Sequence, residues 1–161
     1  KNLAYIPDTP DIYEHLTGIQ YLSFIADAFR ISNIERKNKI REYADRFEMS
    51  NALGNLISSY SHGMKQKISI IAAMIHSPKL MVLDEPFVGL DPKAAVTLKM
   101  VMHELCEKGG AIFFSTHVLE VAQNLCNRVS VIQNGRIILS GNMEELVRDQ
   151  SLEELFMEKI D

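Results

Sequence analysis

Cysteine is scarce in this chain, with two residues among 161. Cys106 and Cys126 have no second pair beside them and no zinc-site spacing, so we expect reduced, partly buried thiols rather than a disulfide framework or a metal centre. Long hydrophobic runs are missing too: none approaches the ~20 apolar residues that cross a bilayer, and Lys1-Asn2 does not lead into a signal segment. We therefore expect a protein that does not span a membrane and does not carry an export signal.

The chain also lacks an excess of basic residues. It has 17 Lys and Arg against 21 Asp and Glu, a formal net charge of -4. Affinity for nucleic acid rests on many basic contacts to phosphate, so no nucleic-acid partner is expected. The basic stretch at residues 36–41 is flanked by Glu35 and Glu42. We interpret it as a solvated helix face, with a docking patch for a partner as the alternative.

What is present is a globular composition with an α/β pattern. Hydrophobic residues make up 47% and charged residues 24% of the chain, and at this length folding can remove roughly 70% of the unfolded surface from water. Short apolar runs predict strands at residues 3–6, 80–83 and 111–115. The second strand is expected to be buried on both faces of a parallel sheet, and the third is expected to be buried as well.

Capping signals predict the helices, and a dipeptide predicts a hairpin. The helix starts are expected at Thr17 with Gln20, at Ile34, at Ser61, at Asp91-Pro92, at Val118, at Asn142 with Glu145, and at Ser151 with Glu154. The helix that begins at Ser61 should run to Ile75 and bury one face. Asn134-Gly135 lies between two apolar runs, which indicates a β-hairpin.

Two adjacent carboxylates follow the second apolar run. Asp84 and Glu85 should lie at the carboxyl-end edge of the sheet, where open α/β sheets bind ligands. Hydrolysis of a nucleoside triphosphate needs a metal across the phosphates, a positioned water and donors for the transferred phosphoryl group. Asp84 is placed to hold Mg²⁺, and Glu85 to orient and deprotonate the water. His117 follows the next strand and could bond the γ-phosphate; the alternative for a single histidine there is a helix cap or a satisfied core group.

A helix start offers a further anion site. Ser61-His62-Gly63 supplies a hydroxyl, free backbone N–H groups and the positive end of the helix dipole, and Gly63 permits close backbone approach. An ordinary capped helix is the alternative for this tripeptide alone. A phosphate-gripping loop, Gly-x-x-x-x-Gly-Lys-Ser/Thr, occurs nowhere in the chain. The machinery for hydrolysis is therefore present but incomplete.

Together these motifs resemble the ATP-binding subunit of an ATP-binding-cassette (ABC) transporter, over essentially the whole chain. In this resemblance the signature motif is residues 60–67, the Walker B strand is residues 80–85, the D-loop is residues 89–91, and the switch histidine is His117. The resemblance implies an α/β fold, a partial P-loop NTPase (RecA-like) parallel sheet with an inserted α-helical subdomain.

The same resemblance implies how the chain divides. Residues 1–161 would form a partial ABC ATPase domain. Residues 11–60 would be the helical subdomain with the signature at its end, and residues 1–10 and 76–161 the remainder of the catalytic core. The helical subdomain would transmit motion to an integral-membrane permease, which places the subunit at the cytoplasmic face of the cell membrane.

The resemblance further implies ATP and Mg²⁺ as cofactors and a head-to-tail dimer, either a homodimer or a heterodimer. Each ATP would lie between the phosphate loop of one subunit and the signature residues Ser61, His62, Gly63 and Met64 of the other. Asp91 and Asp8 would complete the ATP-binding residues, and no nucleic acid is implied. ATP would close the dimer and hydrolysis would open it.

Several positions depart from the family pattern. Asp8 stands where the family usually has a glutamine, and a carboxylate cannot donate as an amide does. His62 replaces the first glycine of the signature and Met64 its glutamine, while Val88 replaces a small polar residue. Such variation resembles the branch that serves multidrug, peptide or antibiotic efflux, so the expected direction is export.

The family's phosphate loop precedes the strand at residues 3–6, so we interpret the chain as a fragment of a longer subunit, truncated before its Walker B half. Alone it is expected to bind ATP weakly or not at all and to be inactive. Two alternatives remain open: the ATPase of a soluble ABC protein, such as a translation factor or a chromosome-maintenance ATPase, and a non-hydrolytic interaction fragment.

Overall fold

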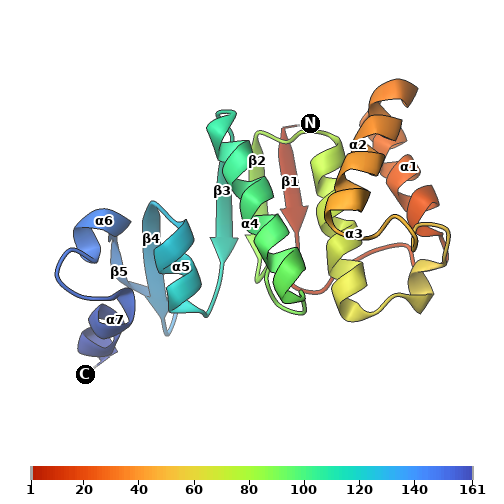
Figure 1. Ribbon diagram of the computed structural model, residues 1–161. Coiled ribbons are helices and arrows are strands. Elements are labelled where there is room, and N and C mark those ends of the chain that lie inside the picture. Colours follow the sequence, from red (N-terminus) through yellow and green to blue (C-terminus); the bar gives the residue numbers. More distant parts are fainter. Residues whose placement is uncertain (1, 161) are drawn as a thin grey trace. The chain divides into compact units, whose positions relative to one another are not determined.

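The computed structural model describes residues 2–160. Their contacts divide the chain into two compact units, with the boundary after Ser115. Figure 1 follows the chain from the first strand to the last helix. No helix in the described part of the chain combines the length and the hydrophobicity that crossing a membrane requires.

The first unit is built on a parallel sheet with the strand order β1-β2-β3. β1 spans Leu3–Ile6, β2 spans Leu80–Asp84 and β3 spans Ala111–Ser115. All three strands lie where they are predicted. Because neighbouring strands run in the same direction, their carboxyl ends lie at one edge of the sheet. This is the edge at which the predicted acidic residues are found.

Helices connect the three strands. Between β1 and β2 lie α1 (Gly18–Ala28), α2 (Asn33–Arg46), the 3₁₀ turn η1 (Ile57–Ser59) and α3 (His62–Ile75), and between β2 and β3 lies α4 (Pro92–Glu107). The predicted caps of α1, α3 and α4 are confirmed. Thr17 and Gln20 form a reciprocal capping box, and Ser61 and Asp91 accept hydrogen bonds from backbone N–H groups of the first turns of α3 and α4.

The core of the first unit lies on one face of the sheet. Ala4, Ile6, Met81 and Leu83 are at most 5% exposed and share one apolar cluster with side chains of α1, α3 and α4. In α3 every residue from 68 to 75 is buried. This burial is more extensive than the single apolar face that the sequence predicts, so α3 is the central helix of the unit.

The opposite face of the same sheet is exposed. Leu3, Tyr5 and Phe113 are 51%, 60% and 69% exposed. The prediction that β2 is buried on both faces and that β3 is buried is therefore wrong: β2 alternates between covered and open side chains, and no residue of β3 is fully buried. The helices of the core cluster cover only one face of the sheet. Side chains of a strand alternate between the two faces, so a run of apolar residues also places apolar side chains on the uncovered face.

The second unit contains one hairpin and three helices. In chain order these are α5 (Leu119–Leu125), β4 (Arg128–Gln133), β5 (Arg136–Asn142), α6 (Met143–Leu146) and α7 (Leu152–Ile160). The predicted hairpin is confirmed: Asn134 and Gly135 have φ of 50° and 74°, the left-handed pair that a two-residue turn requires. Ala122, Met143 and Leu152 form the small core of this unit.

Both cysteines are free thiols. Cys126 is partly buried, as expected, and burial raises the pKa of its thiol. Cys106 is exposed on α4, so the expectation that it is partly buried is wrong. The side chain of Cys106 lies outside the apolar face that α4 presents to the core, which is formed by Leu98, Val101, Met102 and Leu105.

Candidate functional site

Asp84 and Glu85 lie at the end of β2, beside the end of β3. Asp84 is in register with Ser115, the last residue of β3. The Ser115 hydroxyl donates a hydrogen bond to Asp84 Oδ1 at 2.5 Å and accepts one from the backbone N–H of Glu85 at 3.2 Å. One hydroxyl thus ties both acidic residues to the neighbouring strand. Ser115 has no predicted role, although its place at the end of the next parallel strand is a signal that could have identified it.

Glu85 has a strained backbone. Its φ is 45°, in the left-handed region, which costs a residue other than glycine of order 1–3 kcal/mol. The carbonyl oxygen of Glu85 accepts a hydrogen bond from the Val88 N–H at 3.1 Å, so the chain turns sharply after β2. Strain of this kind is concentrated at functional sites. It is consistent with a reactive role for Glu85.

The end of β2 fits one part of a magnesium site. Asp84 offers a carboxylate and Ser115 a hydroxyl oxygen, which are the hard ligands that Mg²⁺ prefers. No group of three His, Cys, Asp or Glu residues within residues 2–160 could hold a metal by itself. Mg²⁺ commonly takes only one or two carboxylates from the protein and the remaining ligands from water and substrate phosphates. Asp84 could therefore serve as the one carboxylate ligand from the protein for a Mg²⁺ ion that binds together with a nucleotide.

The four predicted signature residues lie together at the start of α3. Ser61 is the N-cap, and its Oγ accepts a hydrogen bond from the Met64 backbone N–H at 3.3 Å. Ser61 and His62 are exposed, and the first turn contains no acidic residue. An exposed helix N-terminus without a carboxylate favours a bound anion, because its N–H groups and dipole present positive charge.

Two glycines bring the turn after β2 against the start of α3. A Cβ atom at Gly63 would lie 2.5 Å from the Gly89 carbonyl oxygen, and a Cβ atom at Gly89 would lie 2.4 Å from His62 Cδ2. Gly89 also has a φ of 76°, which side-chain-bearing residues rarely adopt. Residues 60–67 and 89–91 are thus packed against each other. Their separation along the sequence does not predict this contact.

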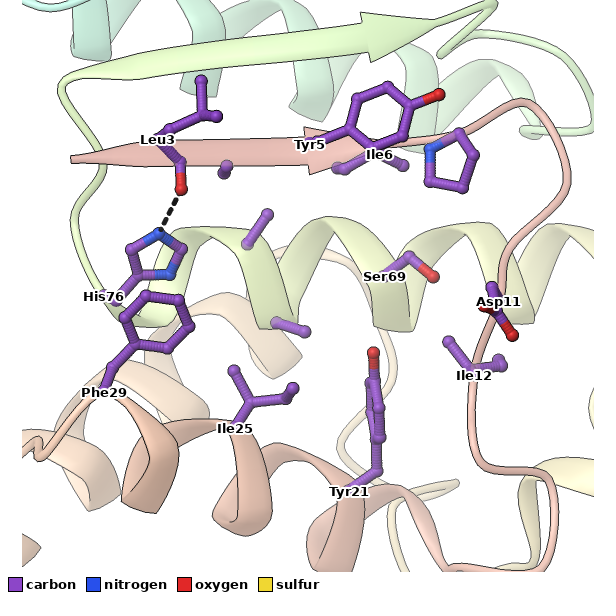
Figure 2. A pocket seen from close by; sticks show the side chains of 14 residues that line it. Leu3, Tyr5, Ile6, Asp11, Ile12, Tyr21, Ile25, Phe29, Ser69 and His76 are labelled. Atoms are coloured by element: carbon purple, nitrogen blue, oxygen red, sulfur yellow. Dashed lines mark hydrogen bonds between the residues drawn. The ribbon is translucent and has the colours of Figure 1, made fainter. Parts of the chain in front are cut away.

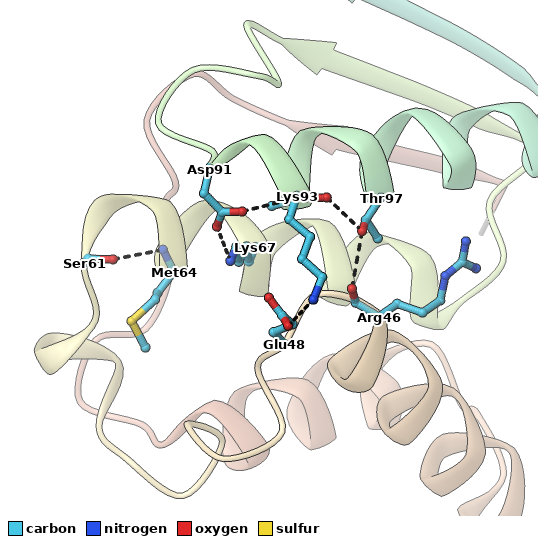
Figure 3. A network of polar contacts seen from close by, with 9 residues as sticks. Arg46, Glu48, Ser61, Met64, Lys67, Asp91, Lys93 and Thr97 are labelled. Atoms are coloured by element: carbon cyan, nitrogen blue, oxygen red, sulfur yellow. Dashed lines mark hydrogen bonds and ion pairs between the residues drawn. The ribbon is translucent and has the colours of Figure 1, made fainter.

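Asp91 uses both carboxylate oxygens in contacts with the protein. Oδ1 accepts a hydrogen bond from the Ala94 N–H at 2.9 Å and so caps α4, and Oδ2 lies 2.6 Å from Lys67 Nζ (Figure 3). The hydrogen bond from Lys67 lowers the pKa of Asp91. Lys67 is a site residue with no predicted role, and the predicted contact between Asp91 and ATP stays a prediction.

Further polar contacts join α4 to the end of α2 and to Glu48, which follows it. Arg46 makes two hydrogen bonds to Glu104, at 2.9 and 2.6 Å, and the hydrogen bond lowers the pKa of Glu104. Lys93 pairs with Glu48, and Thr97 Oγ1 donates to the Arg46 carbonyl oxygen (Figure 3). These contacts fix the end of α2 beside the helix that Asp91 caps.

Asp8 and His117 are the two remaining predicted site residues. Asp8 is exposed and follows β1, so the parallel order of the sheet places it at the same edge as Asp84. His117 is the second residue of the second unit, before α5. Its predicted approach to the catalytic edge stays a prediction.

A separate cavity of about 190 Å³ lies between β1, α1 and α3 (Figure 2). His76 stacks on Phe29 with ring centroids 3.8 Å apart, and its Nε2 lies 3.3 Å from the Leu3 carbonyl oxygen. Burial lowers the pKa of His76 and raises the pKa of Tyr21 to about 12. Asp11 lines the cavity and no Lys or Arg does. The cavity is therefore unsuited to phosphate and is not part of the candidate site.

Known proteins resemble both the sequence and the fold. The family model described as ABC transporter matches residues 1–88. The ABC-type transporter ATP-binding protein EcsA of Bacillus subtilis is 34% identical over 163 residues, which cover 98% of this chain and 66% of EcsA. An uncharacterized ABC transporter ATP-binding protein of Nostoc sp., all4389, is 31% identical over 94% of this chain and 46% of its own length. The chain spans about half to two thirds of the length of these curated relatives.

Solved structures show the same relationship. The ATP binding subunit of an ABC transporter matches with a TM-score of 0.93 and 35% identity, over 99% of this chain and 69% of that chain. CbiO1 from Clostridium perfringens, part of the ABC transporter complex cbiONQ, matches with a TM-score of 0.73 and 23% identity over 98% of this chain and 62% of that chain. At that identity the likeness supports the fold alone. The predicted fold class, a partial P-loop NTPase sheet with an inserted helical subdomain, is confirmed. The chain therefore belongs to the ATP-binding proteins of the ABC transporter family.

Proposed function

We propose that the protein is a subunit that binds and hydrolyses ATP and couples hydrolysis to transport through an integral-membrane permease. The observation that carries this proposal is the Ser115 hydroxyl, which bonds both Asp84 and the backbone of Glu85. It holds the Asp84 carboxylate and the Glu85 backbone at the sheet edge where nucleotides bind in open α/β folds.

In this proposal the two carboxylates have different roles. Asp84 would hold Mg²⁺, which supplies positive charge to the phosphates when it is bound. Glu85 would orient the attacking water and accept its proton, a contribution of roughly 10²–10⁴-fold in rate. His117 would donate a hydrogen bond to the γ-phosphate, and Asp8 would approach the metal or its water.

The start of α3 would bind the ATP held by a second subunit. Ser61, His62, Gly63 and Met64 would form this surface in a head-to-tail homodimer or heterodimer, with Asp91 nearby. Support comes from the exposed N-terminus of α3, whose first turn carries no acidic residue.

Residues 11–60 would act as the helical subdomain, and residues 1–10 and 76–161 as the rest of the core. We place the subunit at the cytoplasmic face of the membrane, against the permease, with no nucleic-acid partner. We propose export as the direction, on the strength of the departures from the family pattern at His62 and Met64. Substrate movement in vesicles that contain the subunit and its permease tests the direction.

ATPase activity of the full-length gene product tests the central proposal. Glu85→Gln keeps the size of the side chain and removes the base, so turnover should fall roughly 10²–10⁴-fold while ATP binding persists. Glu107→Gln is the matched control, because Glu107 lies exposed at the end of α4 and, within residues 2–160, its one ion pair is with His103. Equal turnover in the wild type and Glu85→Gln would remove Glu85 from the mechanism.

A further inference from the structure

The cavity between β1, α1 and α3 lies wholly within the first unit, because all of its lining residues fall between residues 3 and 76. Its volume of about 190 Å³ exceeds the roughly 150 Å³ of an engineered apolar cavity that binds benzene. A molecule with one aromatic ring therefore fits. None of the residues predicted to bind ATP lines the cavity, so it is a separate site.

One end of the cavity is apolar and aromatic. The stacked rings of Phe29 and His76 lie at this end, with Ile25 beside them (Figure 2). Burial lowers the pKa of His76, so its imidazole is uncharged at neutral pH. This end can therefore contact an aromatic ring and contributes no positive charge to the cavity.

The other end of the cavity carries three side chains with oxygen atoms, from Asp11, Tyr21 and Ser69 (Figure 2). Ser69 Oγ donates its one proton to the Lys65 carbonyl oxygen at 3.0 Å, so towards a ligand it can only accept. An ionised carboxylate such as that of Asp11 also only accepts, and the Tyr21 hydroxyl can accept as well as donate. This end therefore offers mainly hydrogen-bond acceptors.

The charge at the cavity has one sign. Asp11 is acidic and exposed, and no lysine or arginine within residues 2–160 lines the cavity. The pKa of Tyr21 is raised to about 12, chiefly by burial, and Tyr13 and the negative charge of Asp11 raise it further. Tyr21 thus stays protonated at neutral pH, and the charge of Asp11 is felt inside the cavity. Such a field favours a cation over an anion.

These features favour one class of ligand. A carboxylate or a phosphate would bring negative charge beside Asp11, and a hydrocarbon would cover the side-chain oxygens without supplying a donor, which is costly. A primary ammonium group supplies three donors and a positive charge. Aromatic rings such as that of Tyr21 also attract a cation to their faces.

We propose that this cavity binds a small aromatic primary amine, with its ring against Phe29 and Ile25 and its ammonium group among the oxygen atoms of Asp11, Tyr21 and Ser69. Binding here requires neither a nucleotide nor a membrane partner, because every group involved belongs to β1, the loop after it, α1 or α3.

Isothermal titration calorimetry with the full-length protein and three matched probes tests the ligand class. 2-Phenylethylamine carries the ammonium group, 2-phenylethanol has a neutral hydroxyl in its place, and phenylacetate is an anion of similar size. The amine should bind with a Kd below about 1 mM. The alcohol should bind roughly threefold or more weakly, and phenylacetate should show no binding at the same concentrations.

Two variants test the location of the site. Asp11→Asn keeps the shape of the side chain and removes its charge, so the amine should bind roughly three- to tenfold more weakly while the alcohol changes by less than about twofold. Ala73→Leu places a larger side chain on the cavity wall and should abolish binding of both probes. Asp149→Asn is the control for total charge, because Asp149 is exposed in the second unit, and it should bind the amine as the wild type does.

Four outcomes would overturn the proposal. These are no binding of the amine up to about 5 mM, binding of phenylacetate or the alcohol as tight as that of the amine, an equal loss in Asp11→Asn and Asp149→Asn, and full binding by a folded Ala73→Leu. Thermal unfolding establishes that each variant is folded. Because Asp11 is exposed, Asp11→Asn keeps the test decisive even where Ala73→Leu fails to fold.

Discussion

The ammonium group of Lys67 lies 2.6 Å from the carboxylate of Asp91, and this ion pair joins α3 to the N-cap of α4. The Lys67 side chain is only 12% exposed. The backbones of Gly63 and Gly89 also pack against each other, so closely that a Cβ atom at Gly63 would lie 2.5 Å from the Gly89 carbonyl oxygen. The ion pair and the glycine contact therefore hold residues 60–67 against residues 89–91, the two segments proposed to face nucleotide.

Asp91 should stabilise the fold through two separable interactions. Asp91→Ala removes the N-cap and the ion pair, so unfolding free energy should fall by about 1–2 kcal/mol. Asp91→Asn keeps a good N-cap and loses only the charge, so its cost should stay below about 1 kcal/mol. Urea unfolding of the full-length protein measures both. Equal costs would mean that the cap contributes nothing.

The same pair predicts a dependence of stability on pH. Because Lys67 lowers the pKa of Asp91 in the folded state, the stabilisation is present above the unfolded pKa of about 4 and is lost as pH falls through the folded pKa. Lys67→Met and Asp91→Asn should each remove this part of the acid sensitivity. Their combination should remove no more than Asp91→Asn alone, whereas Lys67→Met leaves the smaller part that comes from the Ala94 N–H. Urea unfolding in steps between about pH 6 and pH 3 measures it, and additive effects would contradict the pairing.

A side chain at Gly89 should be destabilising because of its backbone conformation and because of a collision, whereas at Gly109 only the backbone conformation opposes it. Both have left-handed backbones, with φ of 76° and 81°, but a Cβ atom at Gly109 would meet nothing within 4 Å. Gly109→Ala should therefore cost about 1–2 kcal/mol, and Gly89→Ala about 1–3 kcal/mol more because it collides with His62. Thermal unfolding compares the two. In a His62→Gly background the extra cost at Gly89 should shrink, and an unchanged cost would show that the collision is unimportant.

Local signals predicted the parts of the fold that depend on a few adjacent residues. The Thr17–Gln20 capping box and the Asn134-Gly135 turn formed as predicted, because each is determined by hydrogen bonds or φ angles within four residues. The position of Asp84 at the end of β2 also followed from its short apolar run. Such features need no knowledge of what packs against them.

Features set by tertiary packing were missed. An apolar run does not reveal which face a helix will cover, so the 69% exposure of Phe113 was not predicted. Lys67 and Asp91 are far apart in sequence, and nothing in the local pattern pairs them. Ser115 could have been identified from its place at the end of the next strand, but its bond to Asp84 depends on the register of β3 against β2.

Ser115 gives the sharpest test of how the catalytic edge is positioned. It is proposed to act through Asp84 and Glu85, so Ser115→Ala should lower kcat for ATP hydrolysis in the full-length protein. A hydrogen bond to a charged group is worth about 1–2 kcal/mol at a partly exposed site, which corresponds to roughly 5–30-fold in rate. KM for ATP should change little, because the phosphate-binding groups at the start of α3 are untouched.

Two further variants separate positioning by Ser115 from a general loss of stability. Ser115→Thr retains the hydroxyl and should restore most of the rate, while Ser130→Ala removes a serine that pairs with Ser140 on the hairpin and should leave kcat unchanged. If Ser115→Ala were as unstable as it is slow, or if Ser115→Thr failed to recover kcat, the hydroxyl would serve the fold and not the reaction. Recovery by threonine with an unchanged KM would instead mean that the rate depends on where the hydroxyl holds the Asp84 carboxylate and the Glu85 backbone.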